Sequence, residues 1–130
     1  MKFEDNLPIY YQIEQQLYYD IVLGKLQPGE KMPSVRQLAL DFTVNINTAQ
    51  HVLSNMQDKG IIYSKRGLGS FVTDDVNLIL VLKDEIISKM FSDFLSKTKK
   101  IGLSNQDTID KLQTFVLKEG PKNEWDTENQ

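Results

Sequence analysis

The stretch of sequence that decides the fold is residues 34–53, SVRQLALDFTVNINTAQHVL. It opens with Ser34 and has Gln37 three residues later, which is the capping-box pattern of a helix N-terminus. In that pattern the hydroxyl and the amide side chain each satisfy a backbone N–H group that has no partner inside the helix. A short helix is therefore predicted, and the residues on its buried side are Val35, Leu38, Ala39 and Phe42.

The three residues that follow, Thr43 to Asn45, are too few for anything but a turn, and Asn45 suits the N-cap of a second helix. Apolar residues then recur at i, i+3, i+4 and i+7, which is typical of one buried helix face. They are Ala49, Val52, Leu53 and Met56, and the face left outside carries Asn47, Thr48, Gln50, His51 and Asn55. Two short helices joined by such a turn predict a helix-turn-helix.

The residues before this motif predict a longer amphipathic helix. It opens at Pro8, a residue that is tolerated in the first turn of a helix. Its apolar stripe recurs at every fourth position, in Ile9, Ile13, Leu17 and Ile21. Gly24 is a suitable stop, and Pro28-Gly29 is a turn dipeptide that reverses the chain.

The residues after the motif predict a β-hairpin. Gly60 ends the second helix, and residues 61–63 and 70–73 are rich in β-branched and aromatic side chains. Between them, residues 65–69 are punctuated by glycine. A hairpin directly after a helix-turn-helix is a wing, so residues 1–75 are predicted to form a winged helix-turn-helix domain.

Composition changes abruptly at residues 74–77, which we interpret as a connector. Beyond it, apolar stripes at helical spacing predict one helix to about Lys100 and another from a cap at Ser104 to Gly120. The fold class is therefore mostly α with a small β-hairpin: a winged helix-turn-helix, then a short two-helix segment over residues 76–120. The polar residues 121–130 are predicted to be a mobile tail.

The apolar stripes of the two C-terminal helices are too wide for each helix to cover the other. A second subunit would cover them, so we predict a homodimer whose dimerisation residues are Ile79, Leu82, Ile86, Met90, Phe94, Leu112, Phe115 and Val116. Two-fold pairing would also place two recognition helices about 34 Å apart, or at a longer spacing, along DNA. The alternative is a monomer in which the tail packs back on the winged domain.

The outer face of the second motif helix suits DNA, because short amide and hydroxyl side chains can enter the major groove. Asn47 and Gln50 are the candidates for base contacts, since amides can bond two edges of adenine. The full predicted DNA-binding set is Ser34, Arg36, Asn45, Asn47, Thr48, Gln50, His51, Lys65, Arg66, Gly67 and Gly69. Ser34 and Asn45 act first as helix caps in this interpretation.

The overall charge opposes a DNA function, because nucleic-acid-binding modules usually have a basic surface. The formal net charge is −3, and residues up to Asp75 hold seven Lys or Arg against nine Asp or Glu. The objection can be answered only if individual cations lie where DNA would bind. The candidates are Arg36 and the wing-tip pair Lys65 and Arg66. The main alternative function is a winged helix that binds protein partners and no DNA.

Several other classes are excluded. The chain has no cysteine and one histidine, so we expect no metal site, and no nucleophile–base pair or glycine-rich phosphate loop predicts an enzyme or a cofactor. We interpret Glu14, Asp20, Asp84 and Glu85 as residues of solvated helix faces. No secretory signal or membrane span is evident, which predicts a cytoplasmic protein. The sequence leaves open a small-molecule effector, bound between the winged domain and the tail, and identifies no ligand.

From Leu7 to Thr73 the sequence resembles GntR-type transcription regulators. The segments that carry the resemblance are residues 8–13 (PIYYQI), 24–39 (GKLQPGEKMPSVRQLA), 44–50 (VNINTAQ), 59–62 (KGII) and 66–72 (RGLGSFV). Each segment alone is a weak signal, but together, at the family's spacing, they are highly specific. Two positions depart from the family: Ile46 stands where many members have arginine or proline, and His51 where the closest subfamily usually has arginine or lysine.

The resemblance implies that Arg36, the face from Asn45 to His51 and the wing around Arg66, Gly67 and Gly69 contact a palindromic operator. Only about 55 residues follow the wing, too few for the larger effector domains of the family. A two-helix tail is similar to that of the short YtrA-like subfamily. That similarity implies a repressor linked to membrane transporter genes.

Overall fold

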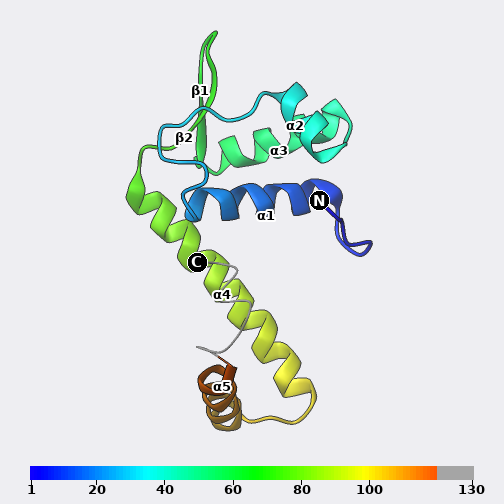
Figure 1. The fold of residues 1–130 in the computed structure, drawn as a ribbon, viewed down its shortest axis with the longest axis vertical. Helices are drawn as coiled ribbons and strands as arrows, with labels where there is room; N and C mark the ends of the chain where they lie inside the picture. Colours follow the sequence, from blue (N-terminus) through cyan, green and yellow to red (C-terminus); the bar gives the residue numbers. More distant parts are fainter. Residues whose placement is uncertain (120–130) are drawn as a thin grey trace. The chain divides into compact units, whose positions relative to one another are not determined.

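The computed structural model describes residues 1–119, so the predicted tail at residues 121–130 lies outside the described residues. The elements, shown in Figure 1, are α1 (Ile9–Val22), α2 (Val35–Phe42), α3 (Ile46–Asp58), β1 (Ile62–Lys65), β2 (Gly69–Val72), α4 (Val76–Lys100) and α5 (Asn105–Glu119). They form two compact units, Met1–Glu85 and a second that starts at Ile86, so α4 contributes to both. The predicted fold class, a winged helix-turn-helix followed by two helices, is confirmed.

Local chemistry places the ends of α2 and α3 where the sequence predicts them. The Ser34 hydroxyl accepts a hydrogen bond from the Gln37 backbone N–H at 3.1 Å, and the Asn45 side chain accepts one from the Asn47 N–H at 2.7 Å. The second half of the predicted capping box is wrong, because the Gln37 side chain donates to Asp41 at 2.6 Å and does not reach back to Ser34. Asp41 lies one turn further along the same helix face and accepts the hydrogen bond of the Gln37 amide instead.

The turn between α2 and α3 is closed by backbone hydrogen bonds. Thr43 adopts the left-handed conformation with a φ of 55°, and its N–H donates to Leu40 O at 3.2 Å. The N–H of Val44 donates to Ala39 O at 2.9 Å. This pair of bonds is the Schellman motif, in which a left-handed residue terminates a helix.

The core of the first unit lies between α1 and α3, and Figure 1 shows the hairpin rising on the side of α3 away from α1. Large side chains of three helices and both strands meet there with almost no exposed surface: Ile13 and Tyr18 of α1, Leu38 of α2, Val52 and Met56 of α3, Ile62 of β1 and Val72 of β2. Each fully buried aliphatic side chain of this kind stabilises the fold by about 1.5–3 kcal/mol relative to an exposed one.

The hairpin is antiparallel, with Ile62 opposite Val72 and Lys65 opposite Gly69. A short segment before α2 lies along the outer edge of β2. The N–H of Met32 donates to Ser70 O, the N–H of Val72 donates to Glu30 O, and Lys31 is paired with Phe71. One face of the hairpin, with Ile62 and Val72, is buried, and the opposite face carries Tyr63 and Phe71.

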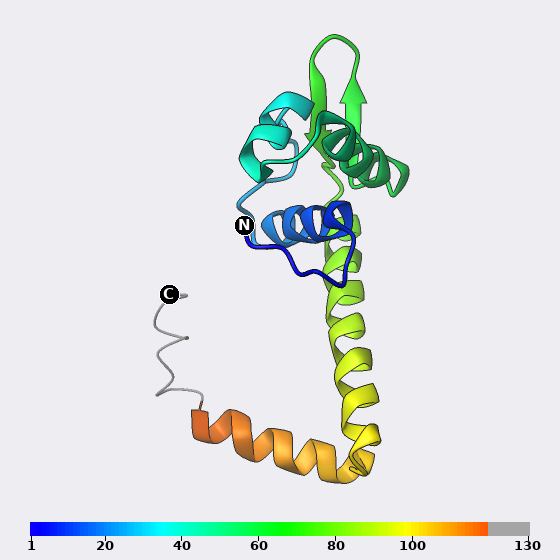
Figure 2. The ribbon, with the colours of Figure 1, turned by 90° about the vertical axis from the view of Figure 1, so that its right-hand side faces the viewer.

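The described part of the second unit is the later part of α4 and α5, joined by a short turn (Figure 2). Gly102 lies in this turn with a φ of 85°. Ser104 caps α5 as predicted, accepting from the Asp107 N–H at 3.1 Å. Within this unit α5 runs off at an angle and does not fold back along α4 (Figure 2). Large apolar side chains are therefore exposed on both helices: Met90, Phe91, Phe94, Ile109, Leu112, Phe115, Val116 and Leu117.

Candidate DNA interface

The exposed side of α3 carries a row of short polar side chains. Asn47, Gln50 and Ser54 are all exposed and lie at i, i+3 and i+7, so they share one face of the helix. The Gln50 amide donates to the Ser54 hydroxyl at 3.2 Å, which orients it along the helix. Thr48, also predicted to face DNA, is half-buried. Hydrogen-bonding groups in this arrangement can read base edges in a major groove.

His51, also predicted to face DNA, is exposed and lies one turn after Asn47, at the edge of this row. Its ring stacks on the ring of Tyr10 in α1, with the centroids 4.2 Å apart and the planes at 29°. The imidazole keeps an exposed edge but is directed toward α1. The stacking contact therefore holds the His51 ring at the edge of the polar row that faces α1.

The first turn of α2 presents Ser34 and Arg36, both exposed. The Ser34 hydroxyl is occupied by its cap bond. Arg36 has no ion pair with any carboxylate of residues 1–119. Its guanidinium is thus available to an external anion, such as a backbone phosphate.

The wing tip is a tight turn in which the N–H of Leu68 donates to Lys65 O at 2.9 Å. Gly67 occupies the third position of this turn with a φ of 77°, which a side chain would make unfavourable. Arg66 is exposed at the apex. The Lys65 ammonium lies over the rings of Phe71 and Tyr63, 4.7 Å and 5.7 Å from their centroids. The tip therefore carries two cations on a short, hydrogen-bonded turn.

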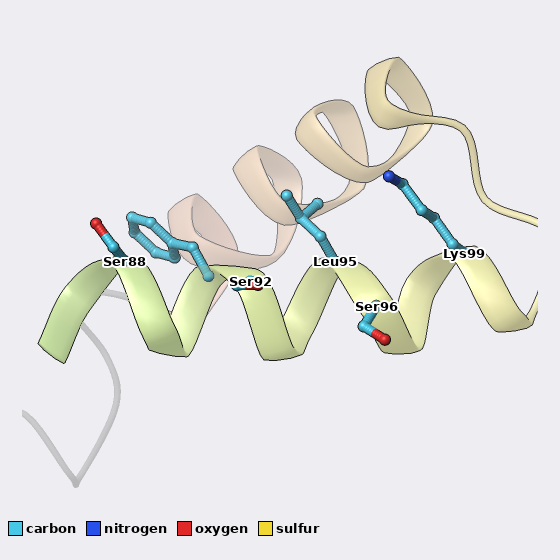
Figure 3. Close-up of a pocket in the computed structure, with 6 residues that line it drawn as sticks. Ser88, Ser92, Leu95, Ser96 and Lys99 are labelled. Carbon is cyan, nitrogen blue, oxygen red and sulfur yellow. The ribbon is translucent and has the colours of Figure 1, made fainter. Parts of the chain in front are cut away.

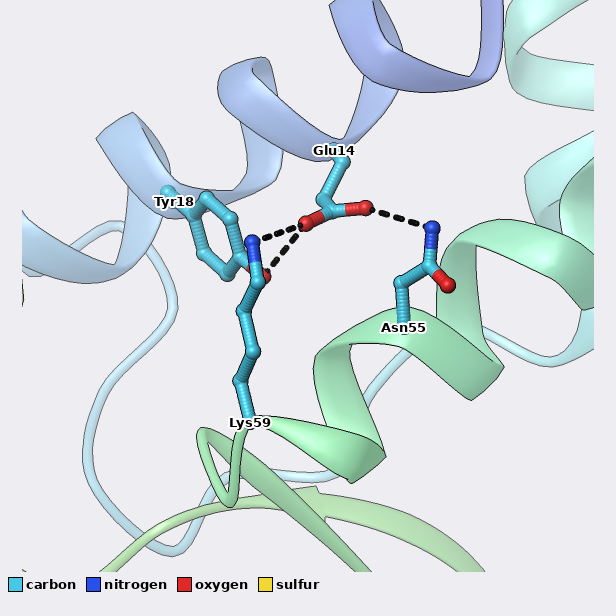
Figure 4. Close-up of polar contacts among 4 residues, drawn as sticks. All are labelled: Glu14, Tyr18, Asn55 and Lys59. Atoms are coloured by element: carbon cyan, nitrogen blue, oxygen red, sulfur yellow. Dashed lines mark hydrogen bonds and ion pairs between the residues drawn. The ribbon is translucent and has the colours of Figure 1, made fainter.

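A flank of α3, beside the polar row, is anchored to α1 by a buried carboxylate, Glu14 (Figure 4). It accepts hydrogen bonds from the Tyr18 hydroxyl at 2.7 Å, the Asn55 amide at 3.1 Å and the Lys59 ammonium at 2.9 Å. The prediction that Glu14 lies on a solvated face is wrong, because its side chain is only 4% exposed. A carboxylate can be buried in this way when donors satisfy both of its oxygens.

The network shifts the pKa values of its members. Burial alone would raise the pKa of the Glu14 carboxyl, but the bonds from Lys59, Tyr18 and Asn55 outweigh burial and hold that pKa below its ordinary value of 4.5. Burial, together with the hydrogen bond to Glu14 and its charge, raises the pKa of the Tyr18 hydroxyl well above 10. At neutral pH the pair is therefore a carboxylate that accepts and a hydroxyl that donates.

Sequence analysis missed Glu14, Tyr10 and one further cation, Lys31, which lies beside the wing. A side chain added at Gly69 would come within 3.1 Å of the Lys31 Cε atom. Local periodicity carries no signal for these three residues, because their contacts are made between segments far apart in the sequence.

The predicted dimerisation residues fall into two groups. Met90, Phe94, Leu112, Phe115 and Val116 belong to the second unit and are exposed, whereas Ile79 and Ile86 are half-buried. Leu82 is 7% exposed within the single chain, so it offers little surface to a partner. An open groove of about 580 Å³ follows α4, and Figure 3 shows Leu95 and Lys99 on its wall. Its lining is Ser88, Phe91, Ser92, Leu95, Ser96 and Lys99.

The part of the chain that the structure describes holds neither a cluster of metal ligands nor a membrane-spanning helix. Among residues 1–119, no cluster of three or more potential metal ligands occurs. None of the helices described is both long enough and apolar enough to cross a membrane.

An outward polar row on the second helix of a helix-turn-helix, beside a cationic hairpin tip, defines the winged helix-turn-helix class of DNA-binding proteins. Residues 9–72 match the family model described as bacterial regulatory proteins, gntR family. The chain is 35% identical over 115 residues to an uncharacterized HTH-type transcriptional regulator, YhcF, of Bacillus subtilis (strain 168), covering 88% of this chain and 95% of that protein. The chain belongs to the gntR family and is a DNA-binding transcription regulator, not an enzyme.

Solved structures agree with this assignment. A GntR family transcriptional regulator from Listeria monocytogenes superposes with a TM-score of 0.80 at 33% identity, over 86% of this chain and 98% of that one. The AraR(DBD) in complex with operator ORR3 superposes with a TM-score of 0.51 at 30% identity, over 56% of this chain and 88% of that one. The first match covers both units, and the second is a comparable domain bound to DNA.

Proposed function

We propose that this regulator is a homodimer that binds a pseudo-palindromic operator and represses transcription by occluding the promoter. The observation that carries the proposal is the outward row of Asn47, Gln50 and Ser54 on a helix whose flank is held to α1 through Glu14. A helix that is anchored along its flank and has a polar outward face can enter a groove without unpacking the core. In this proposal residues 1–75 bind DNA and residues 76–120 join the two copies.

The exposed apolar side chains of the second unit support the dimer. Phe115 is 63% exposed and Leu117 is 71% exposed, on a helix that finds little cover within its own chain. Contiguous apolar surface of this kind usually marks an interface. The groove along α4 alternates small Ser88, Ser92 and Ser96 with Phe91 and Leu95, so a helix of a second copy can approach its backbone closely.

Each predicted contact has a distinct role. Asn47 and Gln50 read base edges, since amides present a donor and an acceptor together. Arg36, Lys65 and Arg66 bind backbone phosphates, which set affinity and register but carry no sequence information. This division accommodates the net charge of −3, because in this proposal Arg36, Lys65 and Arg66 lie where the DNA strands would pass.

The regulatory direction and the targets rest on the resemblance to the short YtrA-like subfamily, which implies repression and transporter genes. A bound dimer that covers a promoter excludes polymerase by volume alone, so repression needs no additional contact. The proposed compartment is the cytoplasm, where bacterial operator DNA lies.

A salt titration tests the phosphate contacts. Labelled DNA from upstream of the protein's own gene is titrated with the full chain at several salt concentrations. Replacing Arg66 by Ala should weaken binding and reduce the slope of log affinity against log salt by about 0.9 for each phosphate that is no longer neutralised. Lys111→Ala on α5 is the matched control and should leave the slope unchanged. Wild-type protein that binds no DNA, or binds it without salt dependence, would instead favour the protein-interaction module.

A second experiment tests base reading by Gln50. Binding of Gln50→Ala is measured against a set of operators that differ by single base pairs. The discrimination at one position should fall by about 1–3 kcal/mol while other positions keep theirs. A uniform loss over all operators would assign Gln50 to the phosphate backbone.

A further inference from the structure

Besides the two cations of its tip, the wing has a further cationic side chain on its outward face, contributed by a segment outside the hairpin. Lys31 belongs to the segment that runs along the edge of β2, where its backbone is paired with Phe71. The neighbouring N–H of Met32 donates to Ser70 O at 2.8 Å. Lys31 is therefore held in register with the wing, as a residue of a third strand would be.

The missing side chain of Gly69 explains where the Lys31 side chain lies. A Cβ atom at Gly69 would be 3.1 Å from Lys31 Cε and 3.9 Å from its Nζ. Gly69 is directly opposite Lys65 in the hairpin register, and cross-strand partners project from the same face of a sheet. Lys31 thus occupies the position that a residue 69 side chain would take, next to Lys65.

The two ammonium groups have no carboxylate partner among residues 1–119. Two acids of the neighbouring segments make other hydrogen bonds. Glu30 accepts from the Gln27 N–H at 3.1 Å, and Asp74 accepts from the Tyr63 hydroxyl at 3.2 Å. Lys65 is in turn restrained above the Phe71 and Tyr63 rings. Two cations on one face of the wing, without an ion-pair partner among residues 1–119, create a local site for an external anion.

We propose that Lys31, placed beside Lys65 by the absence of a side chain at Gly69, is a phosphate-binding residue of the wing. This inference rests on the proposed DNA-binding function and deepens it by naming a further contact. The ligand is a phosphate of the DNA backbone, bound by charge and without base preference. Because the Lys65 ammonium already rests over two aromatic rings in the free chain, binding loses less side-chain entropy at Lys65 than at an unrestrained lysine.

The test is the salt dependence of operator binding by Lys31→Gln and Lys31→Arg in the full chain. Lys31→Gln removes the charge but keeps most of the stem, and should reduce the slope of log affinity against log salt by about 0.9 for each bound copy. Lys31→Arg keeps the charge and should preserve the slope. Lys111→Gln on α5 is the control for a general change of net charge.

The outcomes separate this inference from the proposed function. If Lys31→Gln keeps the wild-type slope while Arg66→Ala lowers it, Lys31 does not bind phosphate and the operator-binding proposal stands. If Lys111→Gln lowers the slope as much as Lys31→Gln, the effect is one of net charge and the inference is overturned. If the wild-type protein itself shows no salt-dependent binding, the proposed operator-binding function is rejected, and the inference about Lys31 is rejected with it. Thermal melting of each variant confirms that it is folded during the titration.

Discussion

The ring of Tyr10 in α1 stacks on the imidazole of His51 in α3, with the ring centroids 4.2 Å apart. The two residues lie far apart in the sequence, and the contact joins the first helix to the middle of the proposed recognition helix. Together with the bonds from Glu14 to Asn55 and Lys59, it ties α3 to α1 along most of its length. The orientation of the polar row on α3 depends on these ties.

The stacked pair should contribute measurably to stability. A double-mutant cycle with Tyr10→Ala and His51→Ala is expected to give a coupling energy of about 0.5–1.5 kcal/mol, the usual value for an aromatic pair beyond its buried area. Urea unfolding followed by circular dichroism measures it. Tyr10→Phe keeps the ring and should retain most of the coupling. Additive single effects would show that the rings do not interact in solution.

Removal of the buried charge at Glu14 should lower the free energy of unfolding by more than loss of the Tyr10–His51 stacking does. In Glu14→Gln one oxygen acceptor becomes a donor that faces other donors, so we expect a loss of about 1.5–3 kcal/mol in the free energy of unfolding. Most of this loss comes from the buried bond to Tyr18 and the partly buried bond to Asn55. The ion pair contributes less, because the Lys59 side chain is 57% exposed and solvent weakens the interaction. Glu85→Gln, at an exposed position, should change stability little.

The same residue predicts a pH dependence. Because the pKa of Glu14 is lower in the folded chain than its ordinary 4.5, the folded state binds fewer protons there than the unfolded state. Its stabilising contribution is complete above pH 4.5 and is lost as the pH falls below that value. The stability difference between wild type and Glu14→Gln should therefore shrink in acid. A difference that stays constant from about pH 7 to about pH 3 would contradict the lowered pKa.

The apolar face of α5 should control the oligomeric state. Phe115→Glu places a charge on an exposed apolar surface, so it should leave the monomer folded and abolish a dimer held by that surface. Analytical ultracentrifugation measures the change from two copies to one, and operator affinity should fall with it. Leu23→Glu, at a residue of the first unit that is 68% exposed, is the matched control. A dimer that survives Phe115→Glu would place the interface elsewhere.

The turn of the helix-turn-helix holds a strained residue. Thr43 has a φ of 55°, and a left-handed conformation costs a β-branched residue roughly 1–2 kcal/mol. Thr43→Asn should relieve part of this strain, because asparagine adopts the left-handed region more readily. We expect the free energy of unfolding to rise by about 0.5–1 kcal/mol, measured in urea. A decrease would mean that the Thr43 side chain makes a stabilising contact.

Local signals in the sequence were sufficient for the elements and for most helix caps. Ser34, Asn45 and Ser104 accept backbone bonds in the structure, as expected of residues chosen for their side-chain oxygen. The outward position of Asn47 and Gln50 also follows from the 3.6-residue period, since the buried stripe leaves only one face free. Gln37 is the exception, because Asp41 on the same face competes for its amide.

What the sequence by itself determined was the order of the elements, the polar face of α3 and the cationic wing tip, all of which depend on neighbours within a few residues. Only the tertiary structure decided that Glu14 is buried, that His51 rests on Tyr10 and that Lys31 lies next to the wing. Each of these contacts joins segments distant in the chain. A side chain with both polar and apolar character has no fixed environment until packing between elements supplies its partners, so its local sequence cannot reveal its position.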